Sequence, residues 1–368
     1  MKYKEGPVAL SSGKVVESVF AAFKVFLGPG KGVAVLLNRP FARGAAAALI
    51  GMSVIGGTAS ADLPDSIRQP RTVELFYSIN VSRISKDAED AFAWVPLPQS
   101  TPDQIAEDVR IESEWPHEVL SEEVFGNQFV RFDFSDAIGT GETAKAGKIT
   151  LRVTRRARAT PARNTVAGDT AEELARFLLP SKLVSIEGAV ADEADRIVGD
   201  EVDPLIRARL LYDNIVDTVA YGKSGDGWGR GDSQFACDVR TGNCTDFHSL
   251  FMGEARHLGI PTRFVMGFGL PDKRGEGTIG GYHCWAEFYV DGYGWISIDA
   301  SEAHRSPLKR DLLFGGLDTS RVQFTKGRDI HLPKAQGAPV NFSIYPYVEV
   351  DGKPHPNVEF TVTFKDVE

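Results

Sequence analysis

Residues 241–261 read TGNCTDFHSLFMGEARHLGIP, and their apolar side chains recur at the spacing of a helix. The apolar face consists of Phe247, Leu250, Phe251, Ala255 and Leu258. Gly259 stops this helix and Pro261 cannot continue it, so Cys244 is predicted in the first turn. The unpaired N–H groups and the dipole of a first turn favour a thiolate over a thiol. A buried structural cysteine is the alternative interpretation, but the preceding Gly242-Asn243 turn favours an exposed one.

A second stretch, YHCWAEFYV at 282–290, alternates like a strand and is followed by DGYG and WISID at 291–299. Strand, glycine turn and strand predict a hairpin that brings His283 near Asp299. A thiolate, an imidazole and a carboxylate that orients the imidazole are the groups of acyl transfer through a thioester. A hairpin symmetric about residues 292 and 293 places Ala286 opposite Asp299. Contact between His283 and Asp299 therefore requires a β-bulge or a register offset.

Together the two stretches resemble the bacterial transglutaminase-like superfamily. The shared pattern is a cysteine at a helix start, GIPTR at 259–263, His-x-Trp-x-Glu at 283–287 and Trp-x-x-x-Asp at 295–299. The resemblance implies that Cys244 is the nucleophile, His283 the base and Asp299 the orienting acid. It also implies an α+β fold with a papain-like core, in which the helix that bears the cysteine packs on an antiparallel sheet. Members of the superfamily include protein cross-linkers, peptidases and amidases.

Period-two alternation predicts strands at 72–81, 129–134 and 148–154, with the turn-rich segment 96–102 between the first two. We therefore expect an N-terminal β-sandwich-like domain over 62–165. Helices are expected at 171–179 and after the Asp203-Pro204 cap, where Ile206, Leu210, Ile215 and Val219 lie near helical spacing. The catalytic domain is expected over 166–310. A C-terminal β extension follows over 311–368, closed by a hairpin of 343–350 with 358–364.

Residues 1–61 carry seven Lys or Arg side chains and two acidic ones, whereas the whole chain has a formal net charge of −9. An uncharged stretch at 44–57 ends in Ala59-Ser60-Ala61, as a secretory signal does. We expect cleavage after Ala61, no stable membrane insertion afterwards, and a periplasmic or secreted protein; an uncleaved membrane anchor is the alternative. The acidic balance disfavours a nucleic-acid partner, which needs a basic face.

The chain has three cysteines, so at least one cannot pair within it. Cys237 and Cys284 could form a bridge that leaves Cys244 free. The C-x6-C-x3-H spacing that ends at His248 fits no compact zinc site, so neither a metal nor another cofactor is expected. His248 lies one helical turn after Cys244 and is a rival for the role of base.

The glycine-rich loop at 222–232 precedes the nucleophile and is expected to form a wall of its cleft. Trp228 and Gln234 are candidate contacts for the substrate or the oxyanion. The sequence thus predicts an exported cysteine-dependent enzyme that acts on amide bonds of proteins or peptides, as a peptidase, amidase or transglutaminase. The alternative is an inactive transglutaminase-like binding module of the cell envelope.

Overall fold

The computed structural model describes residues 69–139, 144–160, 162–164 and 168–367. The predicted targeting segment, 1–61, lies outside these residues. Among the helices of the described residues, none combines the length and the apolar character needed to cross a bilayer.

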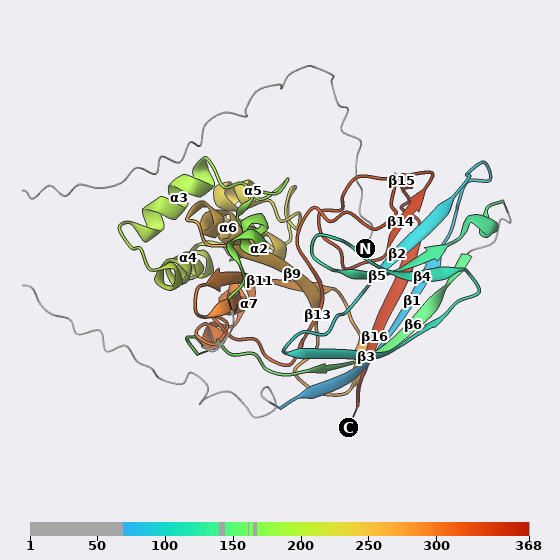
Figure 1. The fold of residues 1–368 in the computed structure, drawn as a ribbon, viewed down its shortest axis with the longest axis horizontal. Coiled ribbons are helices and arrows are strands. Elements are labelled where there is room, and N and C mark those ends of the chain that lie inside the picture. Colours follow the sequence, from blue (N-terminus) through green and yellow to red (C-terminus); the bar gives the residue numbers. More distant parts are fainter. Residues whose placement is uncertain (1–68, 140–143, 161, 165–167, 368) are drawn as a thin grey trace, which may run out of the picture. The chain divides into compact units, whose positions relative to one another are not determined.

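Two five-stranded antiparallel sheets form the β-rich part (Figure 1). The first sheet has the order β10 (Glu276–Thr278), β16 (Val358–Val367), β1 (Arg71–Val81), β6 (Ala144–Arg155) and β3 (Gln104–Glu112). The second has the order β15 (Lys353–Pro354), β14 (Tyr347–Val350), β2 (Ala91–Leu97), β5 (Gln128–Asp133) and β4 (His117–Ser121). Buried side chains of both sheets belong to one hydrophobic core. The two sheets form a β-sandwich, to which strands of 276–278 and 347–367 contribute beside those of 71–155.

The predicted strands match β1, β5 and β6, and the inward face of β1 is fully buried as its alternation predicts. Two expectations about this region are wrong. Pro96 and Leu97, which we expected in a turn, lie at the end of β2. The closing hairpin does not form either, because β14 pairs with β2 in one sheet whereas β16 pairs with β1 in the other.

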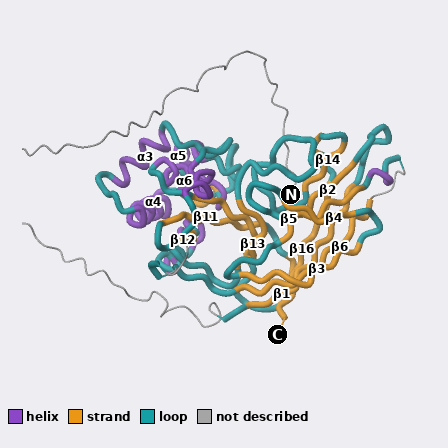
Figure 2. Tube along the Cα trace, in the orientation of Figure 1, coloured by secondary structure: helices purple, strands orange, loops and turns teal. Residues whose placement is uncertain are grey.

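A separate four-stranded antiparallel sheet has the order β12 (Gly294–Ile298), β11 (Tyr282–Val290), β9 (Thr262–Gly269) and β13 (Arg321–Lys326). Helix α6 (Cys244–His257) packs against β11 and β9. Figure 2 shows the helices gathered beside this sheet. This is the predicted arrangement of a cysteine-bearing helix on an antiparallel sheet.

The other helices are α2 (Ala171–Ala175), α3 (Ala189–Val198), α4 (Pro204–Thr218), α5 (Ser233–Val239) and α7 (Ala300–Arg305). Short 3-10 turns occupy Ser135–Ala137, Arg176–Leu178 and Pro307–Lys309. Asp203 caps α4 as predicted, accepting from the N–H groups of Leu205 and Ile206. Ile206 and Leu210 are exposed, however, because the buried face of α4 is formed by Ala208, Leu211, Tyr212, Ile215 and Val216.

Helix α6 is buried on nearly all sides, so its neighbours approach closely. A Cβ atom added at Gly253 would lie 2.4 Å from the carbonyl oxygen of Ser185. Only glycine permits this approach. Two short strands, β7 (Ala220–Tyr221) and β8 (Thr241–Gly242), pair in parallel just before the helix begins.

Side-chain amides join the β-rich part to the edge of the four-stranded sheet. Gln104 donates to the Gln323 carbonyl and accepts from the Gln323 N–H, both at 2.8 Å. Asn127 makes the same pair of bonds with Lys326, again at 2.8 Å. Both amides are buried, and together they satisfy the free edge of β13 as a neighbouring strand would.

Candidate active site

Cys244 is the first residue of α6, so it lies in the first turn of the helix as predicted. The Asn243 side chain caps the helix by accepting from the Thr245 N–H at 2.9 Å. Asp246 completes the capping box by accepting from the Asn243 N–H at 2.9 Å. The cap fixes the backbone on both sides of the cysteine, whose side chain is 2% exposed.

The buried carboxylate of Asp246 also holds the glycine-rich loop. It accepts from the N–H groups of Gly229 at 2.7 Å and Gly231 at 3.0 Å. Both glycines have positive φ angles, and this backbone conformation turns the N–H groups of Gly229 and Gly231 toward the Asp246 carboxylate. Asp246 therefore locks the loop to the start of α6, and it is a positioning residue that the sequence did not point to.

Strands β11 and β12 pair without a bulge, with Ala286 opposite Ile298 and Val290 opposite Gly294. The loop between them has three residues, so the register differs by one position from the hairpin centred on residues 292 and 293. Asp299 then follows β12 at the level of Trp285, which shares a strand face with His283. The register offset that contact required is thus present.

Asp299 brings four groups together and is fully buried. Its Oδ2 accepts from His283 Nε2 at 2.6 Å and from the Arg321 guanidinium at 2.7 Å. Its Oδ1 accepts from the Ser301 hydroxyl at 3.0 Å and from the Glu302 N–H at 2.9 Å, which caps α7. These bonds fix the carboxylate and leave the His283 ring with one orientation.

The charges of this group support one another. Burial alone would raise the pKa of Asp299, but the charges of His283 and Arg321 outweigh it and hold that pKa well below its usual range. Burial would lower the pKa of His283, but the charge and hydrogen bond of Asp299, together with Cys244, raise it to about 10. His283 is therefore an imidazolium at neutral pH. Since Asp299 takes Nε2, Nδ1 is the nitrogen left for the cysteine.

The pKa of Cys244 lies well below that of an ordinary thiol. The Cys284 thiol hydrogen-bonds to its sulfur, and His283 adds a hydrogen bond and a positive charge, which together outweigh burial. Cys284 itself has a pKa well above the usual range, because it is buried beside Cys244. Of the two neighbouring sulfurs, Cys244 is the thiolate and Cys284 the donor.

His248 lies behind this pair and is fully buried. Its Nε2 accepts from the Ala300 N–H at 3.2 Å, so the ring proton resides on Nδ1, 3.6 Å from the Cys284 sulfur. Burial lowers the pKa of His248 and keeps it neutral. The 2.6 Å hydrogen bond to Asp299 is therefore made by His283 and not by His248. His248 instead lies beside Cys284 and orients its thiol.

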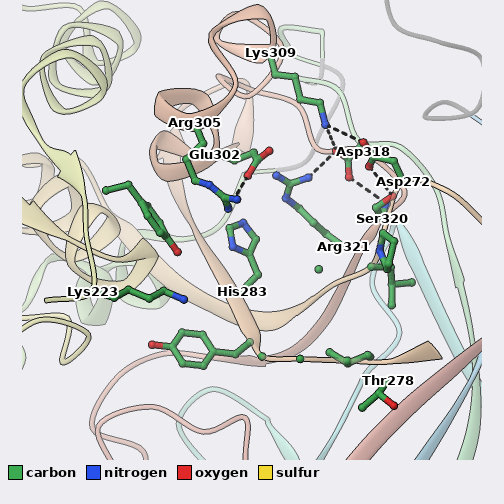
Figure 3. A pocket seen from close by; sticks show the side chains of 18 residues that line it. Lys223, Asp272, Thr278, His283, Glu302, Arg305, Lys309, Asp318, Ser320 and Arg321 are labelled. Carbon is green, nitrogen blue, oxygen red and sulfur yellow. Dashed lines mark hydrogen bonds and ion pairs between the residues drawn. The ribbon is translucent and has the colours of Figure 1, made fainter. Parts of the chain in front are cut away.

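A cavity of about 480 Å³ opens beside His283. Figure 3 shows charged side chains around it, from the loop after β7, from α7 and from β13. Tyr221, Lys223 and Tyr282 line the cavity next to the histidine. Of Cys244, His283 and Asp299, His283 is the one that lines this cavity.

The two other candidate contacts are not placed in this cavity. Trp228 is half-buried within the glycine-rich loop, but the lining residues from this part of the chain are Tyr221 and Lys223. Gln234 donates to Asp238 at 3.0 Å and lines a different cavity, together with residues 180–187. The expected wall of the cleft is thus the beginning of the loop rather than its tryptophan.

All three cysteines are free thiols, so the bridge between Cys237 and Cys284 is not formed. Cys237 instead donates to Glu193 at 3.1 Å. Among the described residues, no three His, Cys, Asp or Glu side chains gather as metal ligands.

Arg321 was not predicted from the sequence, although its guanidinium bridges Asp299 and Asp318 at 2.7 Å each. It lies on β13, outside the motifs, and only the pairing of β13 with β9 brings it to the site. A single arginine in a strand gives no sequence signal of such a role.

Comparison with known proteins gives the same core. Residues 191–300 match the sequence profile of the Transglutaminase-like superfamily. An uncharacterized protein of Haemophilus influenzae is 31% identical over an alignment of 215 residues, with coverage of 50% of this chain and 58% of that protein. The chain thus spans little more than half the length of this relative.

A solved structure shares the fold at low sequence identity. It is that of a candidate cysteine protease from Cytophaga hutchinsonii, with 19% identity, a TM-score of 0.52, and coverage of 81% of this chain and 98% of that one. The cysteine-bearing helix and strands β9, β11 and β12 lie within the matched residues, so residues 191–300 form a transglutaminase-like core domain.

Proposed function

We propose that the protein is a cysteine-dependent enzyme that transfers acyl groups from amide bonds of proteins or peptides. The observation that carries this proposal is the 2.6 Å bond between His283 Nε2 and Asp299, which leaves the other ring nitrogen for a thiolate at a helix start. A nucleophile, a base and an orienting acid in this order are the groups that acyl transfer needs.

In the first step the Cys244 thiolate attacks the amide carbonyl carbon. The N–H groups of Thr245, Asp246 and Phe247 already donate to Asn243, so the backbone N–H of Cys244 is the first-turn donor left for the oxyanion that forms. His283 gives its proton to the leaving amine and the C–N bond breaks, which leaves a thioester on Cys244. Water or a second amine, deprotonated by His283, then attacks the thioester and restores the thiolate.

One experiment distinguishes the possible outcomes of the second step. Residues 62–368 are incubated with a glutamine-rich protein and a labelled amine, beside the Cys244→Ser variant. Incorporated label identifies a transglutaminase, whereas ammonia or new chain termini without incorporation identify an amidase or a peptidase. Serine is nearly isosteric but stays protonated at neutral pH, so the variant should fold and lose the activity. Retained activity in the variant would remove Cys244 from the mechanism.

The 2% exposure of Cys244 is the observation that favours an inactive binding module instead. Iodoacetamide labelling separates the two proposals. An enzyme should be labelled selectively at Cys244 and faster than a model thiol, because its sulfur is ionised. Labelling no faster than a model thiol would favour the module.

We also propose that the chain is exported and cleaved after Ala61. The support is the basic segment followed by the uncharged stretch 44–57 and small residues at 59–61. N-terminal sequencing of protein from the periplasm or medium should give Asp62-Leu63-Pro64. An intact chain in the membrane fraction would support the anchor instead.

A further inference from the structure

Two cations of the cavity beside His283 flank a single aromatic ring. Lys223 Nζ lies 6.0 Å and Arg305 Cζ 5.1 Å from the centre of the Tyr221 ring. All three residues line the cavity together with His283. Figure 3 shows Lys223 and Arg305 entering the cavity from the loop after β7 and from α7, on the side where the His283 ring lies. The two positive charges therefore act on the same space.

These two cations are poorly neutralised by the protein. Among the described residues, Lys223 has no carboxylate within ion-pair distance, and Arg305 has only Glu302, at 3.5 Å. Glu302 also accepts from the Ser306 hydroxyl at 3.0 Å. The other two cations of the cavity differ, because Lys309 lies between Asp272 and Asp318 and Arg321 is bonded to Asp299 and Asp318. The part of the cavity next to Tyr221 therefore carries a net positive charge from Lys223 and Arg305.

The backbone places this charge next to the nucleophile. Strands β7 and β8 are parallel, with Tyr221 opposite Gly242. Lys223 follows Tyr221 by two residues, as Cys244 follows Gly242. Burial raises the pKa of the Tyr221 hydroxyl to about 12, and the negative charge of Cys244 adds to this increase.

We propose that Lys223 and Arg305 form a subsite for a carboxylate of the substrate, so that the enzyme prefers amides with a negative charge near the bond that Cys244 attacks. This inference rests on the proposed function and names its substrate class. A carboxylate between a lysine and an arginine gains charge-assisted hydrogen bonds from both. Its source is either a free chain terminus or an acidic side chain.

Iodoacetate and iodoacetamide test the subsite without a known substrate. Both alkylate Cys244, but only iodoacetate carries a carboxylate, so the ratio of their rates reports the cationic subsite. The ratio should fall about two- to fivefold in Lys223→Met and in Arg305→Met, as expected for partly exposed charge pairs. It should rise in Glu302→Gln, which removes the competing carboxylate. Added salt should reduce the differences among these proteins.

Lys353→Met is the matched control, because it removes the same charge from exposed strand β15 in the other part of the fold. Its ratio should equal that of the wild type. Equal ratios in wild type, Lys223→Met and Arg305→Met would overturn the subsite and leave the enzyme proposal intact. Absence of selective labelling of Cys244 by either reagent would instead overturn the proposed function.

Peptides identify the source of the carboxylate through protection of Cys244 from iodoacetamide. The probes are trialanine with a free carboxylate and a blocked amine, the same peptide with an amidated end, and an amidated peptide with a central glutamate. Better protection by either charged peptide, lost in Lys223→Met, supports the subsite and assigns the terminus or the side chain as its ligand. Equal protection by all three peptides would contradict it.

Discussion

One oxygen of Asp299 is shared by two cations, and this sharing sets the properties of the candidate base. His283 and Arg321 both bond to Oδ2, at 2.6 and 2.7 Å. The arginine is always charged, so it stabilises the carboxylate in every protonation state of the histidine. It also reduces the negative potential that His283 experiences. Arg321 thus keeps Asp299 ionised while moderating the affinity of His283 for its proton.

Asp299→Asn should lower kcat/KM by roughly two to four orders of magnitude while the protein stays folded. Asparagine can still orient the ring and cap α7, but it cannot stabilise the imidazolium. The loss of charge on His283 should also move alkylation of Cys244 to higher pH. His283→Ala should cost at least as much activity. Asp203→Asn, at the cap of α4, is the matched control and should leave both measurements unchanged.

Cys284→Ala should raise the pKa of Cys244, because the thiolate loses the thiol that donates to it. The midpoint of the pH profile for alkylation by iodoacetamide should therefore move to higher pH. Cys237→Ala removes another buried thiol, one that bonds to Glu193, and should not move the midpoint. The same midpoint in wild type and Cys284→Ala would show that Cys284 has no part in ionising the nucleophile.

At the scale of elements, the sequence predicted α6 and the β11–β12 hairpin because short-range signals define both. The Gly242-Asn243 turn, the apolar spacing and Gly259 are all local signals. The register was off by one residue, because a glycine at 292 and another at 294 suit both a two-residue and a three-residue loop. The structure shows the longer loop, in which the Tyr293 N–H donates to the Val290 carbonyl at 2.9 Å.

Strand β11 is held in place by Glu287, a buried carboxylate between two arginines. It accepts from Arg263 at 2.5 Å and pairs with Arg158, which precedes the helical region. Burial would raise the pKa of Glu287, but the two arginines lower it to about 2. The carboxylate thus ties the strand to a segment far away in the sequence.

Glu287→Gln should lower the free energy of unfolding at pH 7 by about 3–5 kcal/mol, because two arginines lose their partner. The folded pKa lies below the ordinary value of 4.5, so this stabilisation is present above about pH 4.5 and is lost as the pH falls through about 2. The difference between wild type and variant in urea unfolding should therefore narrow over that range.

Glu118→Gln is the control for Glu287→Gln, since Glu118 also pairs with two cations but is 37% exposed. Its removal should change the free energy of unfolding by about 1 kcal/mol or less. An equal loss in both variants would mean that burial does not distinguish the two carboxylates.

For the whole molecule, the sequence predicted which segments form helices and strands, but not which distant strands pair with one another. The strands of 71–155 and those of 347–367 form common sheets, although no local pattern links them. Arg71 and Asp366 are 295 residues apart and share a bidentate ion pair. Arg321 was missed for the same reason, since its place at the site depends on which strand lies beside β9.

Val362→Asp should destabilise the entire described fold, because Val362 is 3% exposed on β16 and its pairing with Tyr77 lies inside the first sheet. We expect one thermal transition at lower temperature, with selective labelling of Cys244 lost in the same transition. Thr361→Asp places the charge on the exposed neighbouring position and should have little effect. Unfolding of the sheets with Cys244 still selectively labelled would show that the two parts fold independently.

The position of β16 between β10 and β1 has a consequence for biosynthesis. Strand β1 ends at Val81 and its partner β16 begins at Val358, so β16 is translated long after β1. The first sheet then closes in a late, slow step of high contact order. Until β16 arrives, the edge of β1 that it covers stays unpaired and the sandwich is incomplete.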